Sequence, residues 1–373
     1  MAPDLSLAVT PHRRLFAHFP WHVAVLVLAI SAIGVWNLAS ASRSAHAPVW
    51  ISQASWMGGG IVLALCVTLV DHRAFQRMSW VFYGVVLGLL VLVQLKGRYV
   101  MGARRWLTFG PVNLQPSELA KIAVALVLAS TFAAEADKRR EGYGILEMIV
   151  PLGITLLPAA LILRQPDLGT ALIVIAVGFT QLLFAKVRWV ALGILLVVGL
   201  VGGGVAFRHL KEYQRSRIVS FLNPEADQKG AGYHAWQSII AVGSGQGSGK
   251  GWAQGTQTYL SFLPEQHTDF IFSVWAEEHG FVGCLLLLLL YFALLASGVD
   301  IAGAARDRFG HFLAVGITGM IFWHVFINVG MVIGLLPVVG VTLPLMSYGG
   351  SSVVAVYLGL GLLANVGMRR FVN

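Results

Sequence analysis

The sequence has few charged residues and few cysteines, and both shortages narrow the class of protein. Of the 373 residues only 12% are charged, 57% are hydrophobic, and the mean hydropathy is +0.75, whereas soluble domains carry about 25% charged residues. The two cysteines, Cys66 and Cys284, both lie inside apolar runs, so they offer neither a disulfide framework nor a zinc motif. The composition indicates a membrane protein, and nucleic acid is not an expected partner.

The chain also lacks a hydrophilic stretch long enough for a separate soluble domain, and it lacks a visible internal repeat. Apolar runs near the ~20 residues needed to cross a bilayer recur along its whole length. They cover about residues 20–40, 51–70, 79–95, 116–134, 145–163, 169–185, 187–207, 270–297, 311–336 and 350–367. The sequence therefore predicts an all-α polytopic membrane protein, a single bundle of ten transmembrane helices over residues 1–373.

Basic residues fall mainly on one side of this predicted bundle. They are Arg13, Arg14, Arg73, Arg77, Lys138, Arg139, Arg140, Lys186, Arg188, Arg306, Arg308, Arg369 and Arg370. The positive-inside rule makes this side the cytoplasm, with both termini on it. The first helix resembles a signal peptide, and we expect it to stay uncleaved. The longest loop, about residues 208–268 between helices seven and eight, then lies outside the cytoplasm.

Several cations break this rule, because they lie in the loops of the opposite side. They are Lys96, Arg98, Arg104, Arg105, Arg164, Lys211, Arg215, Arg217, Lys229 and Lys250. One explanation is that long loops translocate regardless of charge. The other is an outward cavity that attracts a phosphate or pyrophosphate group. Composition alone leaves both explanations open.

The long loop contains a helical pattern from Gly232 to Val242 and a glycine-rich stretch, "GSGQGSGKG", after it. This stretch is not a phosphate-binding P-loop, because Ser244 and Gly251 stand where that motif needs a glycine and a Ser or Thr. A tight turn region that packs over a cavity is the expected role.

Ionisable residues inside the predicted spans are candidates for function. Glu118 and Lys121 are three residues apart on one helix and can form an ion pair, which would lock the bundle or serve a site. Glu277 and Glu278 point to different faces, so they more plausibly hold helices together. His324 and Asn328 form a polar stripe that suits bonds between helices.

Asp269 stands at the first turn of the eighth span, at the water boundary. It could cap the helix, as could Thr268 or His267, or it could meet a substrate. Two further motifs rich in helix breakers, "RQPDLGT" and "LPVVGVTLPLMSYGGSS", lie at span ends on the same side. Irregular backbone at membrane depth is tolerated where it lines a cavity. We expect a cavity lined by Arg104, Arg105, Asp167, Asp269 and the loop from Ser347 to Ser352.

Six ordered motifs resemble the SEDS family of bacterial cell-wall polymerases over nearly the whole chain. They are "GARRWLTFGPVNLQPSELAKIA", "QPDLGT", "YQRSRI" with "NPEADQKGAGYHAWQS", "GKGWAQGTQ", "FLPEQHTDFIFSVWAEE" and "LPLMSYGGSS". Residues 337–340 read Pro-Val-Val-Gly, where the division branch, FtsW, usually reads Pro-Thr-Lys-Gly. The sequence thus resembles the elongation branch, RodA.

The resemblance implies a peptidoglycan glycosyltransferase that polymerises lipid II at the outer face of the bacterial cytoplasmic (inner) membrane. It places the family's essential aspartate on Asp269, which would act as general base. Further expected substrate-binding residues are Arg104, Arg105, Glu118, Lys121, Asp167, Arg215, Arg217, Lys250, Ser347, Ser351 and Ser352. A divalent cation, Mg or Mn, could assist, although the sequence offers no ligand set for it.

The implied partners are a class B penicillin-binding protein, which crosslinks the glycan, lipid II with the nascent glycan, and other elongation-complex proteins. Two alternatives remain at this point. A lipid II flippase would also be a helical bundle with charged residues in a cavity, but it needs polar groups along the whole path. An inert scaffold would tolerate loss of Asp269.

Overall fold

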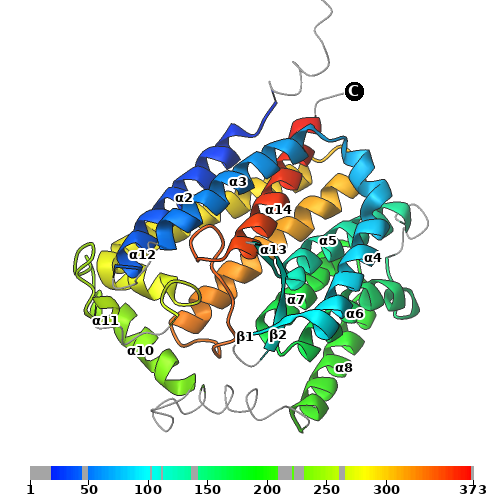
Figure 1. Cartoon of the computed structure of the whole chain (residues 1–373). Helices are drawn as coiled ribbons and strands as arrows, with labels where there is room; N and C mark the ends of the chain where they lie inside the picture. The colour runs from blue at the N-terminus through cyan, green and yellow to red at the C-terminus, as the bar shows by residue number, and fades with distance from the viewer. Residues whose placement is uncertain are drawn as a thin grey trace, which may run out of the picture.

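The computed structural model describes residues 18–43, 49–100, 103–110, 112–135, 142–208, 221, 231–259 and 265–370. Its ten longest helices are α2 (Trp21–Ala41), α3 (Val49–Leu69), α4 (His72–Lys96), α5 (Pro116–Glu135), α6 (Ile149–Arg164), α7 (Leu168–Phe184), α8 (Trp189–Arg208), α12 (Ile271–Gly303), α13 (Arg308–Val332) and α14 (Gly350–Arg369). Each of the ten predicted spans falls on one of these helices, so the predicted all-α bundle is confirmed (Figure 1).

Eight of the helical segments in the described part are long and apolar enough to cross a membrane, and α7 and the first part of α8 are shorter apolar helices. The ninth predicted span was too long, because α13 ends at Val332 and residues 333–349 leave the helix. The described residues also form three shorter helices, namely η1 (Leu146–Met148), α10 (Ala231–Ser244) and α11 (Thr256–Tyr259). The helix expected from Gly232 to Val242 is thus confirmed as α10.

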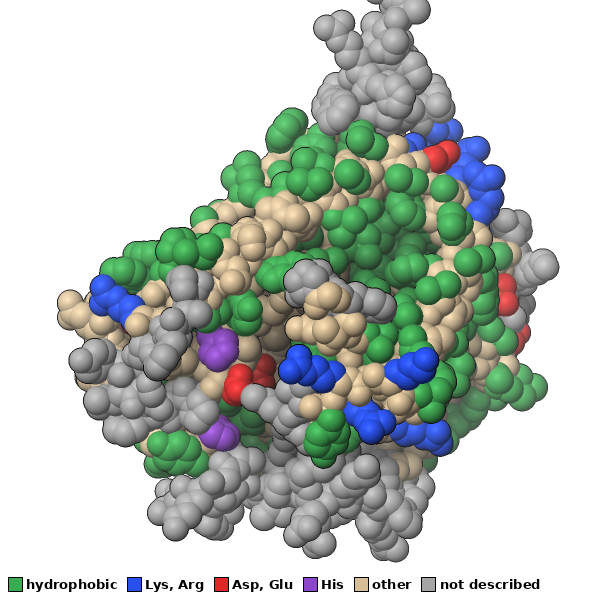
Figure 2. All heavy atoms as spheres, in the orientation of Figure 1, with side chains coloured by type: hydrophobic (Ala, Val, Ile, Leu, Met, Phe, Trp, Pro, Cys, Tyr) green, Lys and Arg blue, Asp and Glu red, His purple; other side chains and the backbone are tan. Residues whose placement is uncertain are grey.

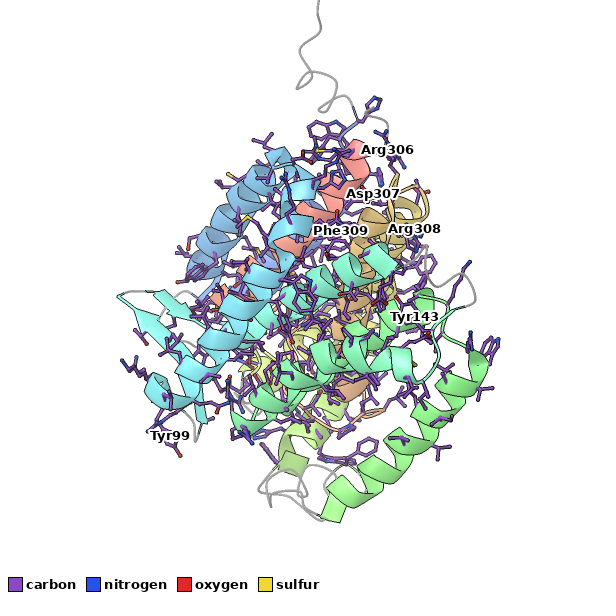
Figure 3. All side chains as sticks on the ribbon, turned by 90° about the vertical axis from the view of Figure 1, so that its right-hand side faces the viewer. Tyr99, Tyr143, Arg306, Asp307, Arg308 and Phe309 are labelled. Carbon is purple, nitrogen blue, oxygen red and sulfur yellow. The ribbon has the colours of Figure 1, made fainter. Side chains whose placement is uncertain are left out.

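The core of the bundle is formed by α5, α13 and α14, which are the most buried of the candidate spans. α13 packs against α5, α7 and α12, while α14 packs against α3. These three helices are rich in glycine and alanine, which lets neighbouring helices approach closely. For example, a Cβ on Gly316 of α13 would lie 2.7 Å from the Gln181 side chain of α7. α8 lies at the edge of the bundle (Figures 1 and 3).

A three-stranded antiparallel sheet lies between α4 and α5 and was not foreseen from the sequence. Its strands are β1 (Arg98–Val100), β2 (Ala103–Phe109) and β3 (Val112–Leu114). β2 pairs with both neighbours, with Tyr99 opposite Arg104 and Leu107 opposite Leu114. In Figure 3 Tyr99 lies at the end of the molecule opposite to the α12–α13 turn.

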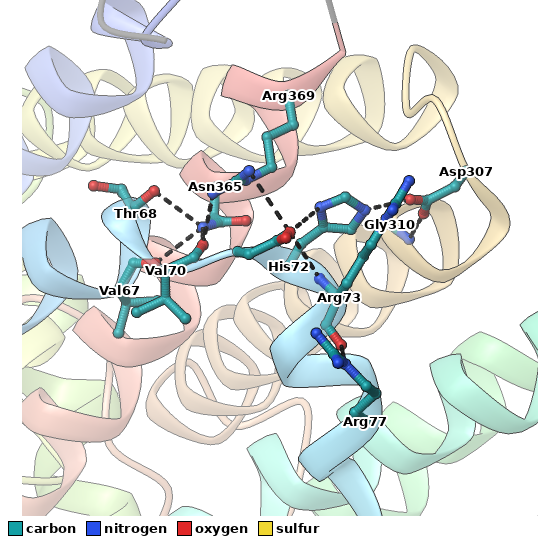
Figure 4. Close-up of polar contacts among 11 residues, drawn as sticks. Val67, Thr68, Val70, His72, Arg73, Arg77, Asp307, Gly310, Asn365 and Arg369 are labelled. Atoms are coloured by element: carbon teal, nitrogen blue, oxygen red, sulfur yellow. Dashed lines mark hydrogen bonds and ion pairs between the residues drawn. The ribbon is translucent and has the colours of Figure 1, made fainter. Parts of the chain in front are cut away.

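Both described ends of the chain lie together, since a Cβ on Gly367 would lie 3.5 Å from Pro20 Cγ. Three of the basic clusters assigned to one side of the membrane, around Arg73, Arg306 and Arg369, also meet at this end. Figure 4 shows Arg73 and Arg369 there. We call it the terminal end, and the end with the sheet the sheet end. Arg13, Arg14 and residues 138–140 lie outside the described residues.

Candidate active site

Asp269 lies at the sheet end, in the turn of residues 265–270 that precedes α12. It is half-buried. Its main-chain carbonyl accepts a hydrogen bond of 2.8 Å from Asn328 Nδ2, and the same amide nitrogen donates to Val341 O at 2.7 Å. A Cβ on Gly340 would lie 3.2 Å from Asp269 Oδ2, so the carboxylate packs on the backbone of Gly340, which has a φ of 76°. Asp269 is therefore held between α13 and the segment 333–349.

The capping roles expected for this turn are wrong. α12 begins at Ile271, its N-cap position is Phe270, and no side chain caps it. Thr268 instead donates its hydroxyl hydrogen bond back to Glu265. Helix capping by Asp269 is excluded by the same observation, and the aspartate lies before the helix and not in its first turn.

The second wall of the site is the segment 333–349, which carries the motif ending in Ser-Tyr-Gly-Gly-Ser-Ser. Ser347 is buried and donates to Thr268 O at 2.6 Å, while Leu343 N donates to the Ser347 hydroxyl at 2.7 Å. Tyr348 N donates to His267 O at 2.9 Å. The segment thus fixes the turn that carries Asp269, and Ser347 acts by holding that turn.

The motif "QPDLGT" lies behind the same segment. Asp167 is buried and caps α7, accepting hydrogen bonds from Thr170 N at 3.2 Å and Thr170 Oγ1 at 2.9 Å. Gln115 Nε2 also donates to Asp167 Oδ2, at 3.1 Å. A Cβ on Gly169 would lie 2.7 Å from Val339 O, so only glycine allows this approach. Asp167 therefore ties the starts of α5 and α7 beneath the segment.

The two serines at the start of α14 connect the sheet to this arrangement. Ser351 donates to Asn113 O at 2.9 Å and accepts from Gln115 N at 3.1 Å. The hydroxyl groups of Ser352 and Thr342 lie 3.0 Å apart. Four of the quoted motifs, far apart in the sequence, therefore converge around Asp269 through hydrogen bonds and close glycine contacts.

A buried polar group lies one helical turn along α13 from Asn328. Lys121 Nζ is 2.8 Å from Glu118 Oε2, which confirms the expected ion pair, and 2.9 Å from His324 Nε2. All three residues are buried. His324 and Asn328 do bond neighbouring elements, as expected from their spacing. Glu118 and Lys121 are thus committed to each other, and their role towards a substrate stays a prediction.

The predicted phosphate-binding cations differ in their availability. Arg105 donates through Nε to Gln165 O at 3.1 Å and through Nη2 to Pro166 O, which makes it a tie between the sheet and α6. Lys250 forms an ion pair of 2.7 Å with the buried Glu277. Arg104 is exposed, with only contacts of 3.5 Å to the carbonyls of Gln94 and Leu95. Arg215 and Arg217 lie outside the described residues.

Figure 2 shows Lys and Arg side chains gathered over the sheet, beside acidic side chains that border a hollow in the surface. The sheet itself brings cations to this position, because it carries Arg98, Arg104 and Arg105. A signal for it was present in the sequence, since "RYVMGARRWLTFGPVNL" combines β-branched and aromatic residues with glycine turns. Hydropathy scanning does not detect such a short sheet.

The glycine-rich stretch packs into a break in α12, which was predicted as a continuous helix. Gly280 has a φ of 62°, and a Cβ on it would lie 2.3 Å from Gly249 N. Phe281 N donates to Gln246 O at 2.8 Å, so the stretch replaces a missing turn of the helix. Glu277 also accepts from Gln257 N at 3.1 Å, and Glu278 accepts from Ser40. Both glutamates hold the fold together.

Among the described residues, no group of three or more His, Cys, Asp or Glu side chains is arranged to hold a metal ion. Asp167 caps α7, and Glu118 and Glu277 form ion pairs. The described residues therefore do not fit the Mg or Mn site considered from the sequence.

The FtsW/RodA/SpoVE family model, described as "Cell cycle protein", matches residues 14–371. The chain belongs to this family. It is 40% identical over 354 residues to the peptidoglycan glycosyltransferase MrdB of Escherichia coli K12, covering 93% of this chain and 92% of that protein. It is 33% identical to the peptidoglycan glycosyltransferase RodA of Treponema pallidum, covering 96% and 99%.

Solved structures agree with this assignment. A structure described as "Structural coordination of polymerization and crosslinking by a peptidoglycan synthase complex" matches with a TM-score of 0.82 and 34% identity, over 95% of this chain and 99% of that one. The crystal structure of Thermus thermophilus RodA matches with a TM-score of 0.72 and 33% identity, over 95% and 98%. The resemblance to the SEDS family is thus confirmed, and the chain is a multi-pass membrane protein.

Proposed function

We propose that this protein is a peptidoglycan glycosyltransferase that polymerises lipid II, with Asp269 as its general base. The observation that carries the proposal is the contrast between Asp269 and the other acids near it. Asp167, Glu118 and Glu277 are buried. Asp269 is half-buried in a turn fixed from two sides. It is the acid placed to meet a substrate at the surface.

The reaction then runs as a single displacement. The Asp269 carboxylate takes the proton from the 4-hydroxyl of the acceptor N-acetylglucosamine as that oxygen attacks the donor's anomeric carbon. The new bond between carbon and oxygen forms while the bond from the anomeric carbon to the phosphate breaks, so the configuration inverts. Undecaprenyl diphosphate leaves as an anion and needs no proton.

Asn328 and Ser347 serve this step as positioning residues, because both bond the main chain of residues 268–269. Arg104 is the described cation best placed to meet the departing diphosphate, since its guanidinium is exposed and has only long contacts. Arg105 and Lys250 support the site through the backbone ties and the ion pair described above. Arg215 and Arg217 remain candidate phosphate ligands.

The proposal extends to location and partners. The terminal end, with its arginine clusters, faces the cytoplasm of a bacterial cell, and the sheet end faces outward from the inner membrane. A class B penicillin-binding protein would crosslink the product, within a complex with other elongation proteins. One relative of known structure comes from a complex that coordinates polymerisation and crosslinking, which supports such a partner.

Purified protein, with and without the penicillin-binding protein, should convert lipid II to glycan polymer, and Asp269→Ala should not, although it reaches the membrane. Gel separation of the products measures this. Lipid II translocation without polymer would favour the flippase. Polymer yields independent of Asp269 would remove the aspartate from the mechanism.

A further inference from the structure

A second polar cavity lies at the terminal end, far from Asp269, and the proposed reaction does not use it. Its volume is about 350 Å³. The charged and imidazole side chains that line it are Asp71, His72, Arg73, Arg306, Asp307 and Arg369. They come from the α3–α4 turn, the α12–α13 turn and the end of α14, so the cavity joins three separate parts of the chain (Figure 4).

The two carboxylates of the cavity are already occupied. Asp71 caps α4 by accepting from Arg73 N at 3.2 Å, and Asp307 caps α13 by accepting from Gly310 N at 2.6 Å. His72 lies between them, with Nε2 2.5 Å from Asp307 and Nδ1 3.4 Å from Asp71. The carboxylates therefore satisfy helix ends and His72, and they fix the walls of the cavity.

Arg73 and Arg369 keep side-chain donors that no described residue uses. Within the described part of the chain, the Arg73 guanidinium makes neither a hydrogen bond nor an ion pair, yet its charge contributes to lowering the pKa of both aspartates, which places it near them. Arg369 donates from Nη2 to Val70 O at 2.8 Å, and its Nη1 lies 3.7 Å from Asp71 Oδ1, while its Nε has no partner among the described residues. Arg306 adds a third guanidinium. Three guanidiniums around one cavity suit an anion with several acceptor oxygens.

We propose that this cavity binds a phosphate group, namely that of an anionic phospholipid head group. The position of the cavity, at the common end of four candidate spans, favours a lipid head group over free phosphate. α3 ends at Leu69, α4 and α13 begin at His72 and Arg308, and α14 ends at Arg369, and all four are candidate spans. Their common end lies where lipid head groups meet the protein, and basic pockets between helix ends bind such groups.

The proposal is tested by lipid retention of the purified full-length protein, without an activity assay. Detergent-solubilised protein is titrated with phosphatidylglycerol or phosphatidylcholine and followed by native mass spectrometry. In a second arm inorganic phosphate is added and thermal unfolding is recorded. The variant is Arg73→Gln, which breaks no hydrogen bond. The matched control is Arg77→Gln, an exposed arginine one turn along the same helix that does not line the cavity.

We expect the protein to retain phosphatidylglycerol in preference to phosphatidylcholine, and Arg73→Gln to weaken this retention about tenfold, as for loss of one charged hydrogen bond. Arg77→Gln should stay within about twofold. If the Arg73→Gln protein does not fold, Arg306→Gln, on another wall of the cavity, replaces it. We expect the same loss of phosphatidylglycerol retention from this second variant. Equal losses for Arg73→Gln and Arg77→Gln would overturn the site. Inorganic phosphate could raise the melting temperature through Arg73 while the protein retains both lipids equally. That result would show that the cavity binds free phosphate and not a lipid head group.

Discussion

The two ends of the bundle are built differently. At the terminal end side chains close three helix ends at short turns: Asp71 caps α4, Asp307 caps α13, and Asn365 Nδ2 donates to the carbonyls of Val67, Thr68 and Val70 at the end of α3. At the sheet end the chain leaves its helices in long irregular segments, and buried side chains such as Asn328 and Ser347 satisfy its backbone groups.

The difference suggests separate roles: the terminal end stabilises the fold, whereas the sheet end also forms the proposed active site. A capped turn needs little room and exposes regular helix ends, whereas irregular backbone at membrane depth persists only where the protein covers it or where it lines a cavity. At the sheet end, the buried side chains of Asn328 and Ser347 fix the turn that carries Asp269. Substitutions there should change activity more than those at the terminal end for the same loss of stability.

The largest expected effect comes from Lys121→Met. The substitution leaves Glu118 buried without its ion-pair partner, and breaking such a pair costs about 3–5 kcal/mol. Unfolding of the purified protein in detergent, followed by tryptophan fluorescence, measures the loss. The double variant Glu118→Gln with Lys121→Met should recover most of it. A double variant as unstable as the single one would show that the charge is not the cause.

Gly280→Ala should cost about 3 kcal/mol, because alanine is strained at a φ of 62° and its Cβ would collide with Gly249 N. Gly59→Ala is the matched control: no atom lies within 4 Å of a Cβ there, and alanine favours a helix by about 0.5–1 kcal/mol. Thermal unfolding of both proteins checks this. If both substitutions raised the melting temperature, the break in α12 at Gly280 would not require glycine.

Asn328 and Asn365 give the most direct comparison of the two ends. Each is buried and donates to main-chain carbonyls, so Asn→Ala should cost about 1–3 kcal/mol at either site. Only Asn328→Ala should also lower polymerisation, by about tenfold or more, because it releases the turn of Asp269. Polymerisation rates corrected for the folded fraction measure this. Equal loss of activity in both variants would abolish the distinction between the ends.

The smallest effect is a pH dependence at the terminal end. The hydrogen bond from His72 lowers the pKa of Asp307, with the Gly310 amide and nearby charges helping. A carboxyl group with a lowered folded pKa stabilises the fold above its unfolded pKa, near 3.8, and this contribution is lost as the pH falls through the folded value. Asp307→Asn should lower the melting temperature at neutral pH, and the difference should shrink and disappear as the pH falls below 3.8 and through the lowered folded pKa. A difference that persists in acid would assign it to packing.

Much of the fold could be predicted from the sequence, because the length and hydropathy of a segment decide whether it crosses a bilayer. Asp269 could be placed at the water boundary for the same reason. The break at Gly280 could not, since it depends on the glycine-rich stretch that packs into it. The pairing of Lys250 with Glu277, 27 residues apart, likewise follows from the folded chain. Because of such contacts, two predicted phosphate ligands, Arg105 and Lys250, also bond other parts of the fold.

The central claim is that Asp269 accepts the proton, and Asp269→Asn tests it most directly because the amide keeps the shape of the carboxylate. Asp300→Asn, at the terminal end of α12, is the control; Asp300 is exposed and bonds Arg370 at 3.3 Å. Polymerisation of lipid II by both variants is measured beside unfolding. We expect Asp269→Asn to fold normally and to lose activity about 10²–10⁴-fold, while Asp300→Asn keeps it. An Asp269→Asn protein that polymerises lipid II as fast as Asp300→Asn would contradict the account.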